Sequence, residues 1–302
     1  MQEHDVNHGL LVVDKPQGPT SHDIVAQARR LLRTRRIGHT GTLDPMATGV
    51  LVLLVGEATK LSCVLASDEK AYRARVQFGF STDTDDAMGS PIVIAPVQEP
   101  LLRKENVERA LTGERERTQQ TPPVFSAIKQ SGQPLYKKAR LGLPVSTEPR
   151  PVAVKSLTLL ELGADYLELE VHCSKGYYVR ALARDLGEAL NCPAHLSALR
   201  RIKAGQFGLD QAIRWPTDSP PPLMSLVDIA RATLRCFELT DAGEQKARLG
   251  QELTSEHFIP SNSPCPSVSD SMAWLHGHQL VAIGRWKDAL SLRVERGFNA
   301  QR

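Results

Sequence analysis

The segment at residues 38–55 reads Gly-His-Thr-Gly-Thr-Leu-Asp-Pro-Met-Ala-Thr-Gly-Val-Leu-Val-Leu-Leu-Val. Its glycines, Gly38, Gly41 and Gly49, disfavour a regular helix. Asp44 stands directly before Pro45, and the proline ring pushes the preceding residue towards extended geometry. The apolar run at residues 50–55 is too short for a helix and predicts a strand buried on both faces. We therefore expect a loop that presents the Asp44 carboxylate, followed by a core strand.

The residues alone leave two interpretations of this loop open. Most glycine-rich loops with one aspartate are turns in which the carboxylate caps a neighbouring backbone N–H. The other interpretation is that Asp44 is presented to a ligand. Two phosphate-binding loops are excluded, because the segment has neither the Gly-Lys-Ser/Thr end of a P-loop nor the Gly-x-Gly-x-x-Gly pattern of a dinucleotide fold.

The composition is that of an ordinary globular protein, with 41% hydrophobic and 24% charged residues in a chain of 302. This length favours two domains over one. No apolar run approaches the roughly 18 residues that cross a bilayer, and the N-terminus lacks the basic and apolar regions of a signal peptide. The 5 scattered cysteines, without a Cys-x-x-Cys pair, indicate a reduced, cytoplasmic protein without a zinc site.

Basic residues gather in two clusters, although the net charge is only +3. The first cluster precedes the Asp44 loop and consists of Arg29, Arg30, Arg33, Arg35 and Arg36. The second lies in residues 118–147, which contain no acid, and consists of Lys129, Lys137, Lys138 and Arg140. Clustered cations favour salt-sensitive contacts to phosphates, so both clusters are candidates for contacts to an RNA backbone. The alternative for each cluster is a solvated helix face.

Periodicity predicts the elements of the first part of the chain. A strand at residues 10–14 and a turn lead to a helix that is capped by Ser21 and ends near residue 34. Clean alternation predicts a half-buried strand at residues 71–80, with Tyr72 on its apolar side.

The middle of the chain is expected to alternate between helices and strands. After a loop at residues 82–89, the pattern predicts a helix at 105–111 that ends at Gly113, a helix at 136–141, and antiparallel strands at 152–161 and 166–173. A further helix begins at Tyr178 and carries Arg180 and Arg184 on its polar face.

Four motifs, in the same order along the chain, resemble those of the TruB family, the bacterial tRNA pseudouridine-55 synthases. They are the loop at residues 38–49, the basic segment that starts at Thr121, Cys-Ser-Lys-Gly-Tyr-Tyr-Val-Arg at 173–180, and His-Leu-Ser-Ala-Leu-Arg-Arg at 195–201. The resemblance implies that Asp44 is the catalytic aspartate and Arg180 its active-site arginine. It also implies that the basic segment grips an RNA hairpin.

The same resemblance implies roles for four more residues. Tyr72 matches an active-site tyrosine that stacks on the uracil or takes the proton lost from C5, and Tyr178 matches a tyrosine that contacts the substrate. His39 matches a residue that fills space around the displaced base, and Leu199 lines the same pocket. The residues alone instead predict a core tyrosine at 72, a loop histidine at 39 and a surface charge at 180.

The fold implied by the resemblance is α+β. It consists of a mixed, largely antiparallel sheet with flanking helices, similar to that of pseudouridine synthases, plus a small β-rich C-terminal domain of the PUA type. We expect the catalytic domain at residues 1–232, with its basic RNA-gripping insertion at about 118–150, and the PUA-like RNA-binding domain at 233–302.

The C-terminal part matches the family more loosely. The proline-rich segment at residues 215–223 begins the exit from the first domain. A helix at 242–249 and strands at 280–286 and 290–294 are expected after it. Residues 260–271 form a low-complexity insert without a counterpart in the family.

The reaction implied is the isomerisation of uridine 55 in the T-loop of tRNA to pseudouridine, with Asp44 as nucleophile on a flipped-out base. The N-glycosidic bond breaks, the uracil turns, and a C–C bond forms to the same ribose, so neither a cofactor nor a metal is expected. The carboxylate has to be ionised, and we expect Arg180 to keep the pKa of Asp44 low. Flipping the stacked base costs a few kcal/mol.

The expected partner is the T-arm stem-loop of tRNA, bound by a monomer that needs no obligatory protein partner and no membrane. Two other functions stay open. One is an RNA-binding, tRNA-folding chaperone in which Asp44 is structural and catalysis is not essential. The other is a guide-RNA-dependent relative that needs protein partners.

Overall fold

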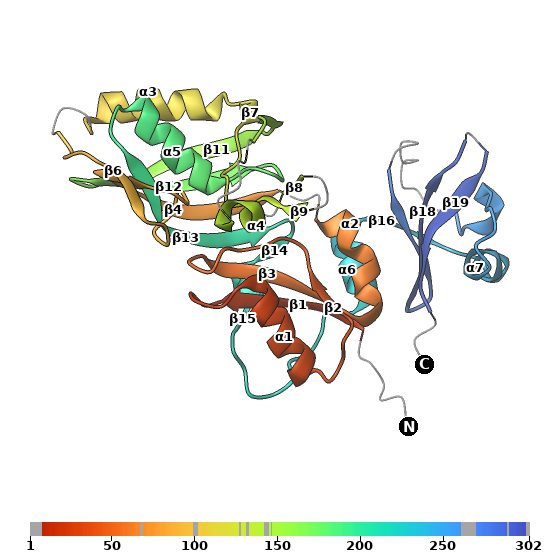
Figure 1. Cartoon of the computed structure of the whole chain (residues 1–302). Coiled ribbons are helices and arrows are strands. Elements are labelled where there is room, and N and C mark those ends of the chain that lie inside the picture. Colours follow the sequence, from red (N-terminus) through yellow and green to blue (C-terminus); the bar gives the residue numbers. More distant parts are fainter. Residues whose placement is uncertain are drawn as a thin grey trace.

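The computed structural model describes residues 8–66, 69–98, 102–126, 128–130, 133–141, 145, 147–260, 270–288 and 290–299. Figure 1 shows a large sheet with helices packed on it and a smaller sheet near the C-terminus. The side chains of three predicted RNA contacts, Lys129, Lys137 and Arg140, lie outside the described residues, as does most of the predicted 260–271 insert.

A nine-stranded sheet forms the larger part of the molecule, in the order β11-β12-β4-β13-β3-β1-β15. These strands are β11 (Val154–Leu162), β12 (Tyr166–Cys173), β4 (Lys70–Phe78), β13 (Ala194–Ala204), β3 (Thr48–Val55), β1 (Gly9–Lys15) and β15 (Ile213–Arg214). In addition, β14 (Phe207–Gly208) pairs with β13, and β2 (Ile37–His39) pairs with β3. The pairs β13–β3 and β1–β15 are parallel, and the other pairs are antiparallel. The predicted mixed, largely antiparallel sheet is confirmed.

Three helices cover one face of this sheet, namely α1 (Ser21–Leu31), α3 (Lys104–Arg115) and α5 (Val179–Ala189). Their apolar sides share one core with the sheet: Ile24 and Val25 come from α1, Leu111 from α3, and Leu182 and Leu186 from α5. Figure 1 shows α3 and α5 over one half of the sheet and α1 over the other. The loop that carries Asp44 contacts Ser21 of α1 and Arg180 of α5, so it has a helix on either side of it.

The opposite face of β1 and β3 is also covered. Val50, Val52 and Leu54 pack there against η1 (Gly56–Leu61), α2 (Ser62–Leu65) and α6 (Leu226–Thr233), while Leu51 and Leu53 point into the first core. Successive strand residues alternate between the two faces, so every residue of this strand from Val50 onward is buried. The predicted strand with two buried faces is confirmed.

The C-terminal unit is a four-stranded sheet of β16 (Arg235–Glu238), β17 (Met272–His276), β18 (Gln279–Trp286) and β19 (Leu292–Gly297). It is accompanied by α7 (Asp241–Arg248) and η3 (Ser255–His257), and Trp274 is fully buried in its core. The predicted small β-rich unit is thus present. Its boundary at residue 233 and its RNA-binding role stay predictions, and α6 contacts both β1 and β18.

Shorter elements complete the part of the chain that the structure describes. They are β5 (Phe80–Thr82), β6 (Pro91–Ile94), β7 (Gln119–Gln120), β8 (Lys129–Gln130), β9 (Gln133–Pro134), α4 (Leu135–Arg140), β10 (Arg150–Pro151) and η2 (Leu209–Gln211). In the part of the chain that the structure describes, no helix is long and apolar enough to cross a bilayer.

Several predicted element ends were wrong. The helix predicted to end near residue 34 ends at Leu31, and the strand predicted at 290–294 spans Leu292–Gly297. The strand predicted at 71–80 ends at Phe78, because Gly79 has a φ of +105° and turns the chain before β5. The helix predicted to end at Gly113 continues to Arg115, and its last turn is held by tertiary contacts: the buried Glu114 accepts from the Tyr177 hydroxyl, and Arg115 donates to the Leu157 carbonyl oxygen.

The start of α1 and the start of the loop also differ from the prediction. The N-cap of α1 is Thr20, whose hydroxyl accepts from the Asp23 N–H while the Asp23 carboxylate accepts from the Thr20 N–H. Ser21 is instead buried within the helix. His39 lies on the short strand β2 and not in the loop, because β2 finds a partner in β3.

Gly49 has a backbone conformation that side-chain-bearing residues rarely adopt, with a φ of +100°. A Cβ atom at this position would lie 2.2 Å from the carbonyl oxygen of Arg201. Gly49→Ala is therefore expected to lower the free energy of unfolding by about 2–4 kcal/mol, measured by urea denaturation. The control is Gly113→Ala inside α3, where a Cβ meets nothing within 4 Å and should raise the free energy of unfolding by about 0.5–1 kcal/mol. Equal stability of the Gly49→Ala variant and the parent would contradict the argument.

Candidate active site

The Asp44 carboxylate lies on the loop between β2 and β3, where it faces the first turn of α5. Its Oδ2 atom is 2.9 Å from Nε of Arg180, and its side chain remains 34% exposed. Arg180 itself is nearly completely buried, at 6% exposure. The surface-charge interpretation of Arg180 is therefore wrong, and the structure brings together the two residues that the family resemblance had paired.

Three buried side chains hold the backbone of the Asp44 loop. Nζ of Lys15 donates to the carbonyl oxygen of Ala47 at 2.7 Å, and the Ser21 hydroxyl donates to the Leu43 carbonyl while accepting from the Leu43 N–H. The Arg201 guanidinium donates to the carbonyl oxygens of Gly41, Thr42 and Val50. Burial lowers the pKa of Lys15 to about 8, although the nearby Asp44 carboxylate opposes this shift. A loop without secondary structure thus acquires a fixed shape.

Arg180 is positioned by the start of α5. Tyr178 is the N-cap residue, and its backbone N–H and C=O both bond to the side-chain amide of Gln120. Besides pairing with Asp44, the Arg180 guanidinium donates to the carbonyl oxygen of Thr84 at 3.0 Å and to that of Phe125 at 2.9 Å. One side chain therefore joins three segments that are distant in the sequence.

Asp86 is a second carboxylate of this site. It is 5% exposed, and its Oδ2 atom lies 3.6 Å from Nη1 of Arg180. Its Oδ1 atom accepts from the Thr84 hydroxyl and the Met88 N–H, so the residue is fixed by its own turn. One arginine thus lies between two acids, and only one of the two acids is accessible.

The pKa of Asp44 is raised above its ordinary value. Burial is the main cause, and the Asp86 carboxylate adds to it, while Arg180 and Lys15 act in the opposite direction. The expectation that Arg180 would hold this pKa low was wrong, because the removal of water outweighs the attraction of the guanidinium. The carboxylate is consequently a stronger base than an exposed aspartate.

Tyr72 and His39 flank the loop from the sheet side. Tyr72 is 8% exposed within the apolar core, and burial raises the pKa of its phenol, so the hydroxyl stays protonated at neutral pH. His39 accepts from the Gly41 N–H through Nδ1, and its ring lies edge-on to that of His22. Burial lowers the pKa of His39, which keeps the imidazole neutral.

Tyr178 and Leu199 complete the set of predicted substrate contacts. Tyr178 is the N-cap residue of α5, two residues before Arg180, and the pKa of its phenol is raised, chiefly by burial. Leu199 lies on β13 opposite Ala74 of β4 and lines a cavity of about 240 Å³ with Met46 of the Asp44 loop and Thr48 at the start of β3. Asp44, Tyr178 and Arg180 are not among the residues that line this cavity.

Much of this chain is similar in sequence to known proteins. The sequence model of the TruB family of pseudouridylate synthases, N-terminal domain, matches residues 29–179. The model of the tRNA pseudouridylate synthase B C-terminal domain matches residues 180–216. The chain belongs to the TruB family.

Curated relatives extend the match to nearly the whole chain. A protein named tRNA pseudouridine synthase B from Syntrophotalea carbinolica is 41% identical over 285 residues, which cover 92% of this chain and 89% of the relative. A protein of the same name from Aromatoleum aromaticum is 45% identical over 237 residues, which cover 76% of this chain and 76% of the relative.

Solved structures show the same fold at much lower identity. The chain is similar to one in a crystal structure of a Cbf5-Nop10-Gar1 complex, with a TM-score of 0.72, 22% identity, and coverage of 97% of this chain and 85% of that one. The pseudouridine-synthase-like fold predicted for this TruB-family chain is therefore confirmed.

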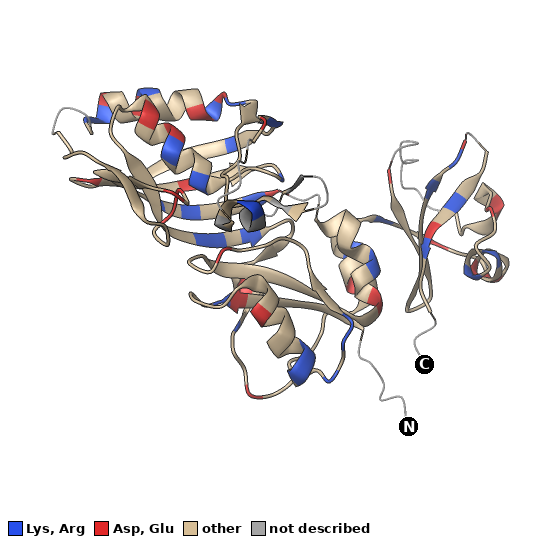
Figure 2. Cartoon of the chain, in the orientation of Figure 1, with Lys and Arg blue, Asp and Glu red and all other residues tan. Residues whose placement is uncertain are grey.

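The first basic cluster is less close to Asp44 than its position in the sequence suggested. Ser21, at one end of α1, contacts the Asp44 loop, whereas Arg30 lies near the other end, about 13 Å further along the axis at 1.5 Å per residue. Figure 2 shows these cations at one end of α1 and in the segment that follows. Arg33 and Arg35 are exposed, and Arg36 pairs with the buried Glu57. Their contact with RNA stays a prediction, as does that of the partly buried Lys138.

Sequence reasoning missed four residues of this TruB-family site, namely Lys15, Ser21 as a loop contact, Asp86 and Arg201. Arg201 ends the fourth motif, which was a usable signal. Asp86 is one of three acids in a stretch of four residues, and nothing local distinguishes it from its neighbours. Only its distance to Arg180 does so.

Replacement of Asp86 by Asn removes one of the charges that raise the pKa of Asp44. The pKa of Asp44 is then expected to fall, so the acidic side of the rate–pH profile should move to lower pH. The maximal rate should fall about tenfold or more, because Arg180 loses one of its fixed partners. Single-turnover rates measured across pH test both effects, and a shift of the acidic side to higher pH would contradict the assignment.

Proposed function

We propose that this protein isomerises uridine 55 in the T-loop of tRNA to pseudouridine, with Asp44 as the nucleophile on a flipped-out base. The observation that supports this most directly is the 2.9 Å contact between the accessible Asp44 carboxylate and the buried Arg180. Relatives of similar length are named tRNA pseudouridine synthase B, which supports tRNA as the substrate.

The chemistry conserves every atom and electron. The bond between N1 of uracil and C1′ of ribose breaks, a bond between C5 and C1′ forms, and the proton lost from C5 is balanced by the one gained at N1. A nucleophile has to attack beside this bond, and its charge has to be balanced as the bond breaks. Asp44 supplies the carboxylate, and the Arg180 guanidinium is already in place to stabilise the charge.

Base flipping explains the residues around the acid. Extruding a stacked base costs a few kcal/mol, and stacking of the base on an aromatic side chain offsets about 1–3 kcal/mol of this cost. Tyr178 begins the helix whose Arg180 contacts Asp44 and is only partly buried, so we assign it the contact to the flipped base. Because the Tyr72 phenol stays protonated, it can donate a hydrogen bond to the uracil, and it takes the C5 proton only if that step first removes its own.

The same proposal covers the binding partner. The T-arm stem-loop would lie over the Asp44 loop, with Leu199 and His39 beside the flipped nucleotide and with the exposed Arg33 and Arg35 towards phosphates. We propose that the protein acts as a monomer in the cytoplasm.

The test uses the purified full-length protein and an unmodified tRNA transcript, with no other protein or RNA present. After incubation, mass-spectrometric mapping is expected to find pseudouridine at position 55 and nowhere else. A transcript with cytidine at position 55 serves as the control. Pseudouridine at another position would overturn the site specificity, and activity that requires an added guide RNA or protein would favour the guide-dependent alternative.

A further inference from the structure

We propose that Arg184, one helical turn after Arg180, is a positioning residue that holds the Asp86 turn and the start of the basic segment in their catalytic places. This inference rests on the proposed function. It concerns two segments that border the Asp44–Arg180 pair, the turn at residues 83–89 and the segment at 121–126.

Arg184 uses its whole guanidinium group for these contacts. Nη1 lies 3.1 Å from Oδ2 of Asp85, and Nη2 donates to the carbonyl oxygen of Thr121 at 2.9 Å. Nε and Nη2 also donate to Oδ1 of the neighbouring Asp185, at 3.0 Å and 2.8 Å. The planar, fork-shaped guanidinium can serve several acceptors at once, which a lysine ammonium cannot do in the same geometry.

Arg180 contacts the same two segments. It donates to the carbonyl oxygens of Thr84 and Phe125, on the turn and on the basic segment respectively. Positions i and i+4 of a helix share one face, so the two arginines contact both segments at successive levels of α5. Arg180 reaches the nucleophile, and Arg184 does not touch it but fixes what surrounds Arg180.

The Asp86 turn needs such a contact because its backbone is strained. Asp85 has a φ of +60°, a left-handed conformation that costs a non-glycine residue about 1 kcal/mol or more. The turn is tied to β13 by two hydrogen bonds, from Ala87 N–H to the Leu196 carbonyl and from Leu196 N–H to the Asp85 carbonyl. The ion pair with Arg184 adds a further constraint, on the residue directly before Asp86.

The environment of Asp85 makes this ion pair more than a surface contact. Its side chain is only 17% exposed, and that of Arg184 is 25% exposed. Burial raises the pKa of Asp85, while Arg184 is the main opposing influence. Loss of Arg184 would leave Asp85 partly buried without its closest cation, so the turn would rearrange and carry Asp86 away from Arg180.

The experiment compares Arg184→Gln, Arg184→Lys, Asp85→Asn and the Arg184→Gln/Asp85→Asn double variant. Asparagine tolerates the left-handed conformation, so Asp85→Asn removes the ion pair without forcing the turn to change. Arg115→Gln is the control, because Arg115 on α3 also joins a carboxylate, that of Glu108, to a carbonyl from a distant segment, that of Leu157, but it lies outside the two segments that Arg184 contacts. Three quantities are measured for each variant: the single-turnover rate constant with T-arm RNA at saturating enzyme, the Kd for that RNA, and the thermal unfolding midpoint.

Arg184→Gln is expected to lower the rate constant about tenfold to a hundredfold. Arg184→Lys should recover part of this loss, and the double variant should be no slower than Arg184→Gln alone. Arg115→Gln should leave the rate constant within twofold of that of the parent. Its thermal unfolding midpoint should shift by about as much as that of Arg184→Gln. A rate constant within twofold of the parent for Arg184→Gln, or strictly additive effects in the double variant, would overturn the proposal.

Hydrogen exchange separates this proposal from the proposed function. The amides of Ala87 and Leu196 report the turn directly, without any activity assay. Faster exchange at both amides in Arg184→Gln, but not in Arg115→Gln, is expected. Unchanged exchange at these amides refutes the positioning role, whereas a parent protein that makes no pseudouridine refutes the proposed function alone.

Discussion

Asp44→Asn is expected to abolish pseudouridine formation, with a loss of at least about 10⁴-fold in the single-turnover rate constant. Losses of this order follow when a nucleophile or its activating partner is removed from a covalent mechanism. Asparagine keeps the size of the side chain and can still accept a hydrogen bond from Arg180, so the loop should keep its shape. The Kd for T-arm RNA should change by less than about threefold, because the phosphate contacts stay in place.

The measurement is single-turnover mapping of pseudouridine, paired with an RNA-binding titration on the same preparation. Asp218→Asn is the control, since Asp218 is an exposed aspartate in the proline-rich segment. Turnover by Asp44→Asn at a rate near that of the parent would remove Asp44 from the chemistry. It would leave the RNA-folding alternative as the better account of the protein.

Arg180→Lys is expected to lower the rate constant by about 10²–10³-fold, although the charge is conserved. Lysine presents one ammonium group, so it cannot contact Asp44, the Thr84 carbonyl and the Phe125 carbonyl together. The loss is of the size seen when one fixed group that stabilises developing charge is removed.

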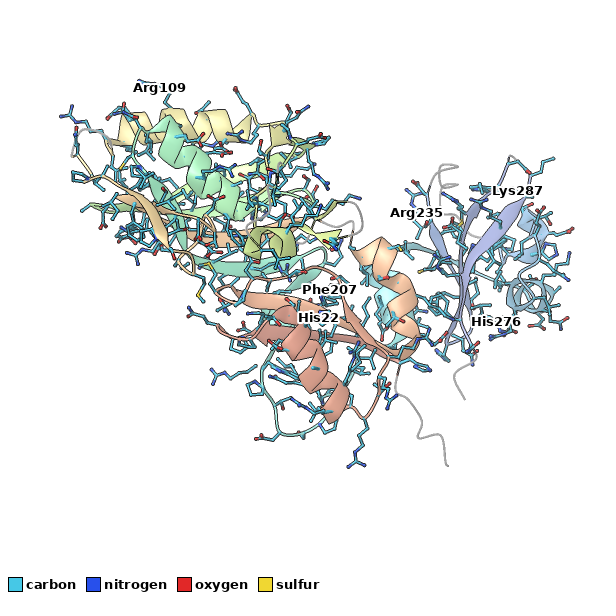
Figure 3. All side chains as sticks on the ribbon, viewed as in Figure 1. His22, Arg109, Phe207, Arg235, His276 and Lys287 are labelled. Carbon is cyan, nitrogen blue, oxygen red and sulfur yellow. The ribbon has the colours of Figure 1, made fainter. Side chains whose placement is uncertain are left out.

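The same change should move the pH profile in a defined direction. Arg180 lowers the pKa of Asp44 against the effect of burial, so a lysine that loses the hydrogen bond from Nε to Oδ2 lets this pKa rise further. The active form is the ionised carboxylate, and the acidic side of the profile should therefore move to higher pH, opposite to the shift expected for Asp86→Asn. Arg109→Lys on α3 is the control, because Figure 3 shows this side chain pointing out from the helix and away from the sheet. A loss of less than fivefold in the rate constant of Arg180→Lys, or a shift of the acidic side of its profile to lower pH, would argue against the pairing of Asp44 with Arg180.

Structural features that depend on residues adjacent in the sequence could be predicted. The glycines and the Asp44–Pro45 step indicated a loop, and the apolar run behind it indicated a strand with two buried faces. Alternation placed Tyr72 on the buried side of β4. The pairing of Asp44 with Arg180 was also anticipated, although only through the family resemblance of four motifs, because no periodicity links positions so far apart.

Residues whose role depends on what packs against them were not predictable. The positive φ at Gly79 ended β4 early, and the distant partners of Glu114 and Arg115, namely Tyr177 and Leu157, extended α3 past a glycine. The shift of the Asp44 pKa was predicted with the wrong sign, since a sequence shows which charges exist but not how much water is excluded around them.

The sequence alone was enough to determine that a carboxylate would lie on a loop directly before a core strand. Backbone preferences act over a few residues, and this feature depends on nothing further away. The tertiary structure alone decided that Lys15, Ser21 and Arg201 hold this loop, and that Asp86 lies across Arg180 from Asp44. Those contacts join segments that are distant in sequence, and burial and charge pairing arise only when such segments are packed together.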